Sequence, residues 1–131
     1  MTEPNTHPMI DASLCGEVAE LSPGRAVVRL ETSAQMVADP QGLVHGGFVF
    51  GAVDYAAMLA VNDPNVVLGG ADVRFVAPVA LGDVVEATAR VIERRGKKRV
   101  VEVRAAVASR EVLTGVMTAF VLEEHVLTSR T

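Results

Sequence analysis

A continuous apolar segment, Gly46–Val61, limits the folds open to this chain more than any other feature. Its sequence, GGFVFGAVDYAAMLAV, places apolar residues on all sides of a helix, and Asn62-Asp63-Pro64 then ends the pattern. Phe and Val would also suit a strand, but sixteen residues are long for a strand and the Ala-rich second half favours a helix. We therefore expect a helix that is buried on most of its surface.

Six other segments have the character of strands. Two short runs, 16–21 and 25–31, are joined by Ser22-Pro23-Gly24, which predicts a hairpin. Four longer runs follow, 66–76, 84–94, 99–108 and 113–123, of which the second and third alternate apolar and polar residues, and we expect the four to form an antiparallel meander. Their apolar face has to cover the helix. The predicted fold is α+β, with a long central helix wrapped by a curved antiparallel sheet of about six strands.

Length and composition limit the class of protein. We expect one domain over residues 11–124, with a flexible N-terminal tail (1–10) and a C-terminal tail (125–131). A net charge of −4 and only five aromatic residues, four Phe and one Tyr, argue against a nucleic-acid partner. Cys15 is the single cysteine, which favours a reducing, cytoplasmic location and leaves no cysteine-based metal site. We therefore expect no metal. The longest apolar stretch is too short for a membrane span, so we expect no membrane partner either.

Asp54 lies in the middle of the apolar segment. A carboxylate at such a position is destabilising unless it is paired, hydrogen-bonded or protonated. One interpretation is structural: Asp54 caps a loop amide or pairs with a basic residue of a neighbouring strand. The other is functional: Asp54 is a general base or nucleophile in a cleft, with a pKa raised by desolvation.

The run Gly42-Leu43-Val44-His45-Gly46-Gly47 directly precedes the expected helix. Backbone amides at a helix start are free to donate, and the helix dipole there favours negative charge, as an oxyanion hole requires. The simpler interpretation is a tight turn at Gly46-Gly47, with His45 hydrogen-bonded at the helix entry. The free amides and the Asp54 carboxylate can belong to one site.

These residues resemble a known family. Asp39-x-x-Gly42-x-x-His45-Gly46-Gly47, with Asp54 nine residues after the histidine, is similar to the signature Asn-x-x-Gly-x-x-His-Gly-Gly…Asp of PaaI-like hotdog-fold acyl-CoA thioesterases. The resemblance implies a hotdog fold, paired chains with edge-to-edge sheets, and active sites at the dimer interface. It covers residues 16–123 approximately.

The resemblance also implies roles for individual residues. Asp54 would activate water or attack the thioester carbonyl, Gly46 and Gly47 would donate amide hydrogens to the carbonyl oxygen, and His45 would place the thioester or its loop. Asp39 departs from the family, which most often has Asn there. The added negative charge near Asp54 would raise one pKa of the pair and alter or weaken the activity.

A basic cluster lies further along the chain. Between Arg90 and Arg104 there are seven Lys and Arg residues against two Glu, a local net charge of +5. The cluster is either a solvated hairpin tip or a phosphate-binding site for a coenzyme A moiety. The resemblance favours the second interpretation, whose residues are Arg95, Gly96, Lys97, Lys98 and Arg99, with Gly96 and Lys97 as the leading contacts.

The expectation is therefore an acyl-CoA thioesterase that needs no cofactor, since coenzyme A is part of its substrate. The assembly would be a homodimer or a dimer of dimers. The alternative is a non-catalytic acyl-CoA binding or sensing module on the same scaffold, which Asp39 makes plausible. A hotdog hydratase ranks third, because the loop before His45 lacks the expected Asn-rich pattern.

Overall fold

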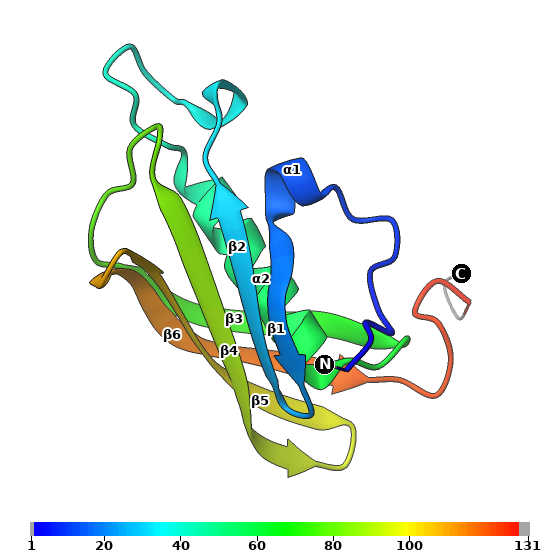
Figure 1. The fold of residues 1–131 in the computed structure, drawn as a ribbon. Coiled ribbons are helices and arrows are strands. Elements are labelled where there is room, and N and C mark those ends of the chain that lie inside the picture. Colours follow the sequence, from blue (N-terminus) through cyan, green and yellow to red (C-terminus); the bar gives the residue numbers. More distant parts are fainter. Residues whose placement is uncertain (1, 129–131) are drawn as a thin grey trace.

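The computed structural model describes residues 2–128 and has one long helix packed on a sheet (Figure 1). Met1 and residues 129–131, the end of the expected C-terminal tail, lie outside the described residues. In chain order the elements are α1 (Ala12–Cys15), β1 (Glu17–Ser22), β2 (Arg25–Glu31), a 3-10 turn (Ala34–Met36), α2 (Gly46–Val61), β3 (Val66–Phe75), β4 (Val84–Arg95), β5 (Lys98–Val107) and β6 (Arg110–Val121). The predicted helix, the hairpin and all four later strands are present.

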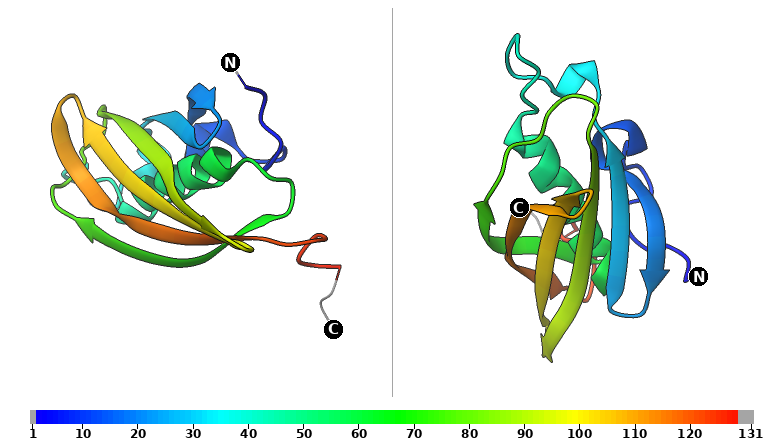
Figure 2. Two further views of the ribbon diagram at one scale, coloured as in Figure 1. Left: turned by 90° about the horizontal axis from the view of Figure 1, so that it is seen from below. Right: turned by 60° about the vertical axis from the view of Figure 1, so that its left-hand side comes forward.

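All six strands form one antiparallel sheet in the order β1-β2-β4-β5-β6-β3. The sheet curves around α2, which lies against its concave side (Figure 2). The predicted α+β arrangement, with a central helix wrapped by about six strands, is confirmed.

The predicted four-strand meander is wrong for β3. Only β4, β5 and β6 are consecutive neighbours, whereas β3 pairs with β6 at the edge and β4 pairs with β2. The connection over residues 76–83 crosses from the edge to the middle of the sheet. Its eight residues can span about 26 Å, more than the roughly 14 Å between strands three places apart. The sequence of this connection has the character of a turn, but the connection is long enough to cross the sheet. Local sequence pattern cannot distinguish such a crossover from a hairpin.

The core lies between α2 and the sheet. Nine of the sixteen α2 residues are buried, and four of them are alanines (Ala52, Ala56, Ala57, Ala60). On β4, Val85, Ala87 and Ala89 are buried on the facing side. Because the side chains on both surfaces are small, the helix can approach the sheet closely. The close packing leaves little room for polar side chains in α2.

The N-terminal residues 2–10, which we call the N-terminal arm, run beside the C-terminal end of α2 (Figure 2). Asn62, the left-handed C-cap of α2, accepts a hydrogen bond from Asn5 N (2.7 Å) and donates one to Glu3 O (3.0 Å). Thr2 N donates to Leu21 O (3.1 Å), and the Thr6 residue is 6% exposed. The arm then enters α1, and Gly16 turns the chain into β1 with φ +99°, where a Cβ would collide with Val28.

One edge of the sheet is formed by β3, which pairs only with β6. Phe75 and Val76 at its end are 55% and 53% exposed. A long edge strand flanked by exposed apolar side chains is a surface on which another strand can pair. Among residues 2–128, no helix is long and apolar enough to cross a membrane.

Candidate functional site

The loop before α2 is held in place by backbone hydrogen bonds at both ends. His45 N donates to Met36 O (2.8 Å) and Val44 N donates to Val79 O (2.8 Å), so the loop is anchored to the 3-10 turn and to the β3–β4 connection. Asp39 folds its interior: Oδ1 accepts from Gln41 N (3.0 Å) and Leu43 N (3.2 Å). Asp39 therefore has an identifiable structural role in its own loop, an Asx-type turn.

The first two amides of α2 are free to donate. In the part of the chain that the structure describes, neither Gly46 N nor Gly47 N has an acceptor, and His45, the N-cap, makes no side-chain cap hydrogen bond. The amides lie at the positive end of a sixteen-residue helix. Such donors suit an oxygen on which negative charge develops.

The two glycines also make room for neighbouring rings. A Cβ on Gly46 would lie 3.3 Å from the ring of Phe75, and one on Gly47 would lie 3.1 Å from the ring of His45. His45 is exposed and meets Phe48 edge-on, with ring centroids 6.2 Å apart. The imidazole thus lies beside Gly47 at the start of α2 and makes no side-chain cap hydrogen bond.

Asp54 lies in the third turn of α2, where it is half-buried. Within residues 2–128, no hydrogen bond or ion pair involves its carboxylate, so neither of the two structural roles considered for it from sequence is observed. Burial raises the pKa of Asp54, and the charge of His7 opposes that rise. Burial, with the charges of Asp11 and Asp54, also raises the pKa of the nearby Cys15 thiol.

Gly47 and Asp54 share one face of α2. They are seven residues apart, nearly two turns, which separates them by about 10 Å along the helix axis. Between them Gly51 faces open space, since a Cβ there would meet no atom within 4 Å. The free amides and the backbone of Asp54 are therefore nearly two turns apart on the same helix.

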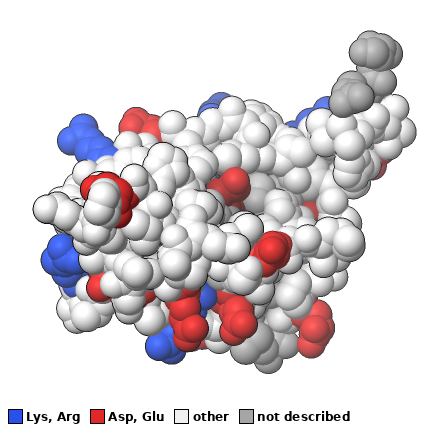
Figure 3. All heavy atoms as spheres, turned by 90° about the horizontal axis from the view of Figure 1, so that it is seen from above, with Lys and Arg blue, Asp and Glu red and all other residues white. Residues whose placement is uncertain are grey.

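The basic turn between β4 and β5 lies at the other end of the sheet from the loop before α2 (Figure 1). β4 starts at Val84 beside that loop and ends at Arg95, eleven residues later, a length of about 36 Å. A single chain therefore does not bring Arg95, Gly96 and Lys97 to His45. Seen from the end that is uppermost in Figure 1, Lys and Arg lie at the rim whereas Asp and Glu also occur in the middle (Figure 3).

Not all cations of the cluster are available to a ligand. Arg90 pairs with Glu102 (3.1 Å) and Arg104 with Glu111 (3.5 Å) on the sheet. Arg99 Nη1 donates to Gly96 O (2.7 Å) and Lys98 O (3.0 Å), which closes the turn.

Four exposed cations of the cluster, Arg94, Arg95, Lys97 and Lys98, have no ion pair within residues 2–128. A hollow of about 520 Å³ beside Lys97 is also lined by Glu123 and Glu124, so its charge is mixed.

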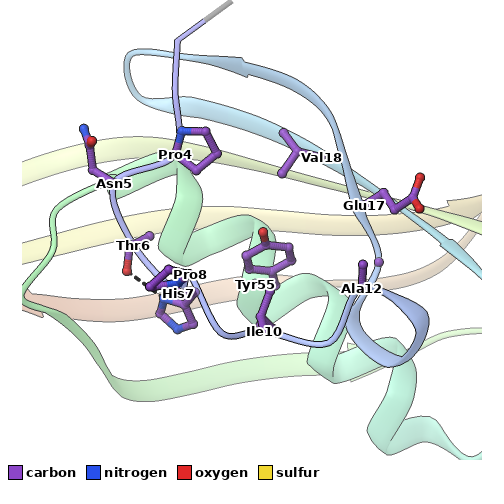
Figure 4. Close-up of a pocket in the computed structure, with 11 residues that line it drawn as sticks. Pro4, Asn5, Thr6, His7, Pro8, Ile10, Ala12, Glu17, Val18 and Tyr55 are labelled. Atoms are coloured by element: carbon purple, nitrogen blue, oxygen red, sulfur yellow. Dashed lines mark hydrogen bonds between the residues drawn. The ribbon is translucent and has the colours of Figure 1, made fainter.

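Two further hollows contain residues that sequence reasoning missed. One of about 350 Å³ lies beside the loop, between Gly42 and Pro78, and includes Arg110. The other, of about 540 Å³, lies between the N-terminal arm and β1, and His7 and Tyr55 line it (Figure 4). Neither histidine nor tyrosine there carried a sequence signal, because their proximity depends on how the arm folds back. Among the described residues, no group of three His, Cys, Asp or Glu side chains could hold a metal ion.

Comparison with known proteins places the chain in a family. Residues 41–114, more than half of the chain, match the model of the thioesterase superfamily. The chain belongs to this superfamily. The matched region contains the end of the loop, all of α2 and β3 to β5, so the hotdog fold and the resemblance to PaaI-like thioesterases are confirmed.

Solved structures agree. Protein PH1136 from Pyrococcus horikoshii is 50% identical, with a TM-score of 0.95 over 96% of this chain and 97% of that one. A mutant of the phenylacetic acid degradation protein PaaI from Thermus thermophilus is 30% identical, with a TM-score of 0.76 over 83% and 95%.

The curated relatives carry other names and are longer proteins. The methylthioribose-1-phosphate isomerase of Aquifex aeolicus is 49% identical over 84% of this chain, which spans only 24% of its length. The transcription factor FapR of Caldanaerobacter subterraneus is 30% identical over 93% of this chain and 62% of its own length. The hotdog region thus occurs as part of proteins with unrelated names.

Proposed function

We propose that this protein hydrolyses acyl-CoA thioesters, using the Asp54 carboxylate and the amides at the start of α2. The observation that carries the proposal is the state of Asp54: a half-buried carboxylate in an apolar helix, without a hydrogen bond or ion pair in residues 2–128. A group of this kind lowers stability, and such groups are typical of functional sites. Membership of the thioesterase superfamily supports the same chemistry.

The proposed reaction has two candidate routes. In the first, Asp54 takes a proton from water as the water oxygen attacks the thioester carbonyl carbon, and the C–S bond then breaks to release the acid and the CoA thiol. In the second, the carboxylate itself attacks, the C–S bond breaks and CoA leaves as the thiolate. Water then hydrolyses the acyl-aspartyl anhydride to the acid and the free carboxylate, and the proton released goes to the thiolate. In both routes the carbonyl oxygen becomes negative, and the amides of Gly46 and Gly47 stabilise it.

The proposal requires two copies of the chain. Because Gly47 and Asp54 of one helix are about 10 Å apart, the amides of one chain and the carboxylate of another have to meet at one thioester. A two-fold axis beside the unpaired edge of β3 would run the two chains in opposite directions. That arrangement would also bring the basic turn of the partner toward the end that carries His45.

The coenzyme A moiety is proposed to contact Arg95, Gly96, Lys97 and Lys98. Their exposed, unpaired cations suit phosphate groups, whereas Arg99 supports the turn. A hypothetical thioesterase with coenzyme A from Streptococcus pneumoniae shares the fold at 20% identity, which supports the scaffold alone.

The experiment is a screen of acyl-CoAs for release of free thiol by the parent protein and by Asp54→Asn. We expect turnover by the parent and a loss of at least about 10²-fold in the variant. Equal turnover by a folded variant would remove Asp54 from the mechanism, and no turnover with any acyl-CoA would refute the proposal.

A second candidate is a non-catalytic acyl-CoA binding or sensing module, and the similarity to a protein named transcription factor FapR favours it. Acyl-CoA would then bind with a measurable heat in calorimetry, and no thiol would appear at any enzyme concentration. Asp39, with a charge where the family most often has an amide, is the residue that would explain the lost turnover.

A further inference from the structure

Phe75, the last residue of β3, packs on the first residue of α2. A Cβ on Gly46 would lie 3.3 Å from Cε1, 3.6 Å from Cδ1 and 3.8 Å from Cζ of the Phe75 ring. Because Cβ positions in a helix tilt toward its N-terminus, the ring lies at the end of α2 that carries the free amides. The absence of a side chain on Gly46 therefore makes the room in which the ring stands.

The sheet sets the position of this ring. Phe75 is paired with Leu113 of β6, which is fully buried, and the next residue, Val76, donates its N–H to Val112 O (2.9 Å). The contact between Phe75 and α2 thus joins the end of a strand to the start of a helix. Side chains carried on such elements are held more precisely than side chains on loops.

Much of the ring nevertheless remains free. Phe75 is 55% exposed, whereas Phe48, Phe50 and Phe120 are half-buried. A large apolar side chain that stays in water forgoes the stabilisation that burial would give. The ring also lies beside Gly46, whose N–H has no acceptor within residues 2–128. Apolar surface next to a few unpaired polar groups is the composition of a small-molecule site.

Two rings of different polarity flank the free amides. Phe75 stands against Gly46, and the His45 ring would lie 3.1 Å from a Cβ on Gly47. Consecutive residues of a helix point about 100° apart, so the two rings lie on different sides of the helix start. A thioester whose carbonyl oxygen accepts from the amides has an acyl group on one side of the carbonyl and the polar pantetheine arm on the other. The phenyl ring suits an apolar acyl group, and the imidazole suits the pantetheine arm.

We propose that Phe75 is a specificity-determining residue for the acyl group. The inference rests on the proposed function and names its substrate class: apolar acyl groups longer than acetyl, aromatic ones included. The carbons next to the carbonyl would lie on the free surface of the Phe75 ring while the carbonyl oxygen is held at the amides. Acetyl has too few carbons to cover the ring, and a charged group such as succinyl would lose hydration there.

The test compares kcat/KM of the parent, Phe75→Leu and Phe75→Ala for acetyl-, hexanoyl-, benzoyl- and succinyl-CoA. We expect the parent to prefer hexanoyl- and benzoyl-CoA, and Phe75→Ala to lose about tenfold or more on these two and little on acetyl-CoA. Phe75→Leu keeps an apolar side chain without a ring, so it should retain turnover of hexanoyl-CoA and lose turnover of benzoyl-CoA. Equal losses on all four substrates would overturn the proposal.

Val116→Ala is the matched control. Val116 is a 38% exposed apolar residue on β6, in register with Asp72 and Glu102, and its loss should leave the order of substrates unchanged. Light scattering of each variant separates a contact with the acyl group from a contact with a partner chain. Phe75→Ala should keep the mass of the parent. A loss of assembly with a uniform fall in kcat/KM would mean that the partner covers the ring, which overturns the proposal.

Binding separates this inference from the proposed function. Calorimetry gives the Kd of acetyl- and hexanoyl-CoA for Asp54→Asn and for the double variant Asp54→Asn/Phe75→Ala. A preference for hexanoyl-CoA that disappears in the double variant supports the role of Phe75, and the same ratio of Kd values in both proteins overturns it. A parent that hydrolyses no acyl-CoA would refute the proposed function alone, because Phe75 would still select the acyl group of a bound, unhydrolysed ligand.

Discussion

Replacing Asp54 by Asn should make the protein more stable and less active. An unsatisfied buried polar group costs about 1–3 kcal/mol. Asp54 is only half-buried and keeps some contact with solvent, which places its effect at the lower end. We therefore expect Asp54→Asn to raise the free energy of unfolding by about 1 kcal/mol at neutral pH, or a few degrees in Tm.

The pH dependence of this gain follows from the direction of the pKa. Burial raises the pKa of Asp54, so the folded state binds the proton more tightly than the unfolded state. The protonated, neutral form of Asp54 carries no charge-burial cost. Parent and variant should therefore be about equally stable below the pKa of Asp54 in the unfolded chain, which is near 4. As pH rises from there through the higher pKa of Asp54 in the folded state, the parent loses stability relative to Asp54→Asn. Above that pKa the difference in the free energy of unfolding stays constant.

The assay is urea unfolding at a series of pH values, together with thiol release from acyl-CoA. Glu93→Gln is the control, because Glu93 is an exposed carboxylate on β4 and has no ion pair in residues 2–128. The reasoning fails if Asp54→Asn is destabilised at neutral pH, since that would mean the carboxylate makes a stabilising contact. It also fails if the stability difference does not depend on pH.

Three further predictions concern other parts of the site. Gly46→Pro removes an amide donor at the first helical position, where proline is tolerated, and should lower kcat by about 10²-fold. The control is Gly46→Ala, which adds a similar Cβ near Phe75 but keeps the N–H. Equal losses of kcat in the two variants would refute the oxyanion role. Lys97→Ala should raise KM for acyl-CoA more than for a pantetheine thioester, and equal effects would identify the turn as a solvated tip. Asp39→Asn should keep the Oδ1 bonds of its loop and move the acid limb of kcat/KM to lower pH, and an unchanged profile and rate would leave Asp39 a purely structural residue.

The elements of the fold were predictable from the sequence because their signals are local. Gly46–Val61 is bounded by glycines and by Asn62-Asp63-Pro64, and the helix occupies those residues. The neighbours of β3 were not predictable, because pairing with β6 depends on a crossover whose sequence resembles an ordinary turn. The pairing of β3 with β6 joins residues 38 to 55 positions apart, and local periodicity carries no information on that partner.

The candidate site was predictable as a motif but not as an arrangement. The sequence identified the amides of Gly46 and Gly47 and the carboxylate of Asp54. Whether these groups have hydrogen-bond partners depends on tertiary contacts, and in the described structure they have none. It could not place His7 beside Tyr55, because a terminal segment with little apolar character gives no periodic signal. The basic cluster looked uniform in sequence. The register of β4 and β5, however, places Arg90 opposite Glu102, and this ion pair makes Arg90 unavailable to a phosphate.

The most direct test of a thioester site shared between two chains is to mix two inactive variants. Asp54→Asn chains keep intact amides, and Gly46→Pro chains keep an intact carboxylate. After subunit exchange, half of the dimers should be mixed, and each should contain one complete site, so about a quarter of the parent activity should return. Mixed dimers detected by mass spectrometry without any return of thiol release would contradict a site built from the amides of one chain and Asp54 of its partner.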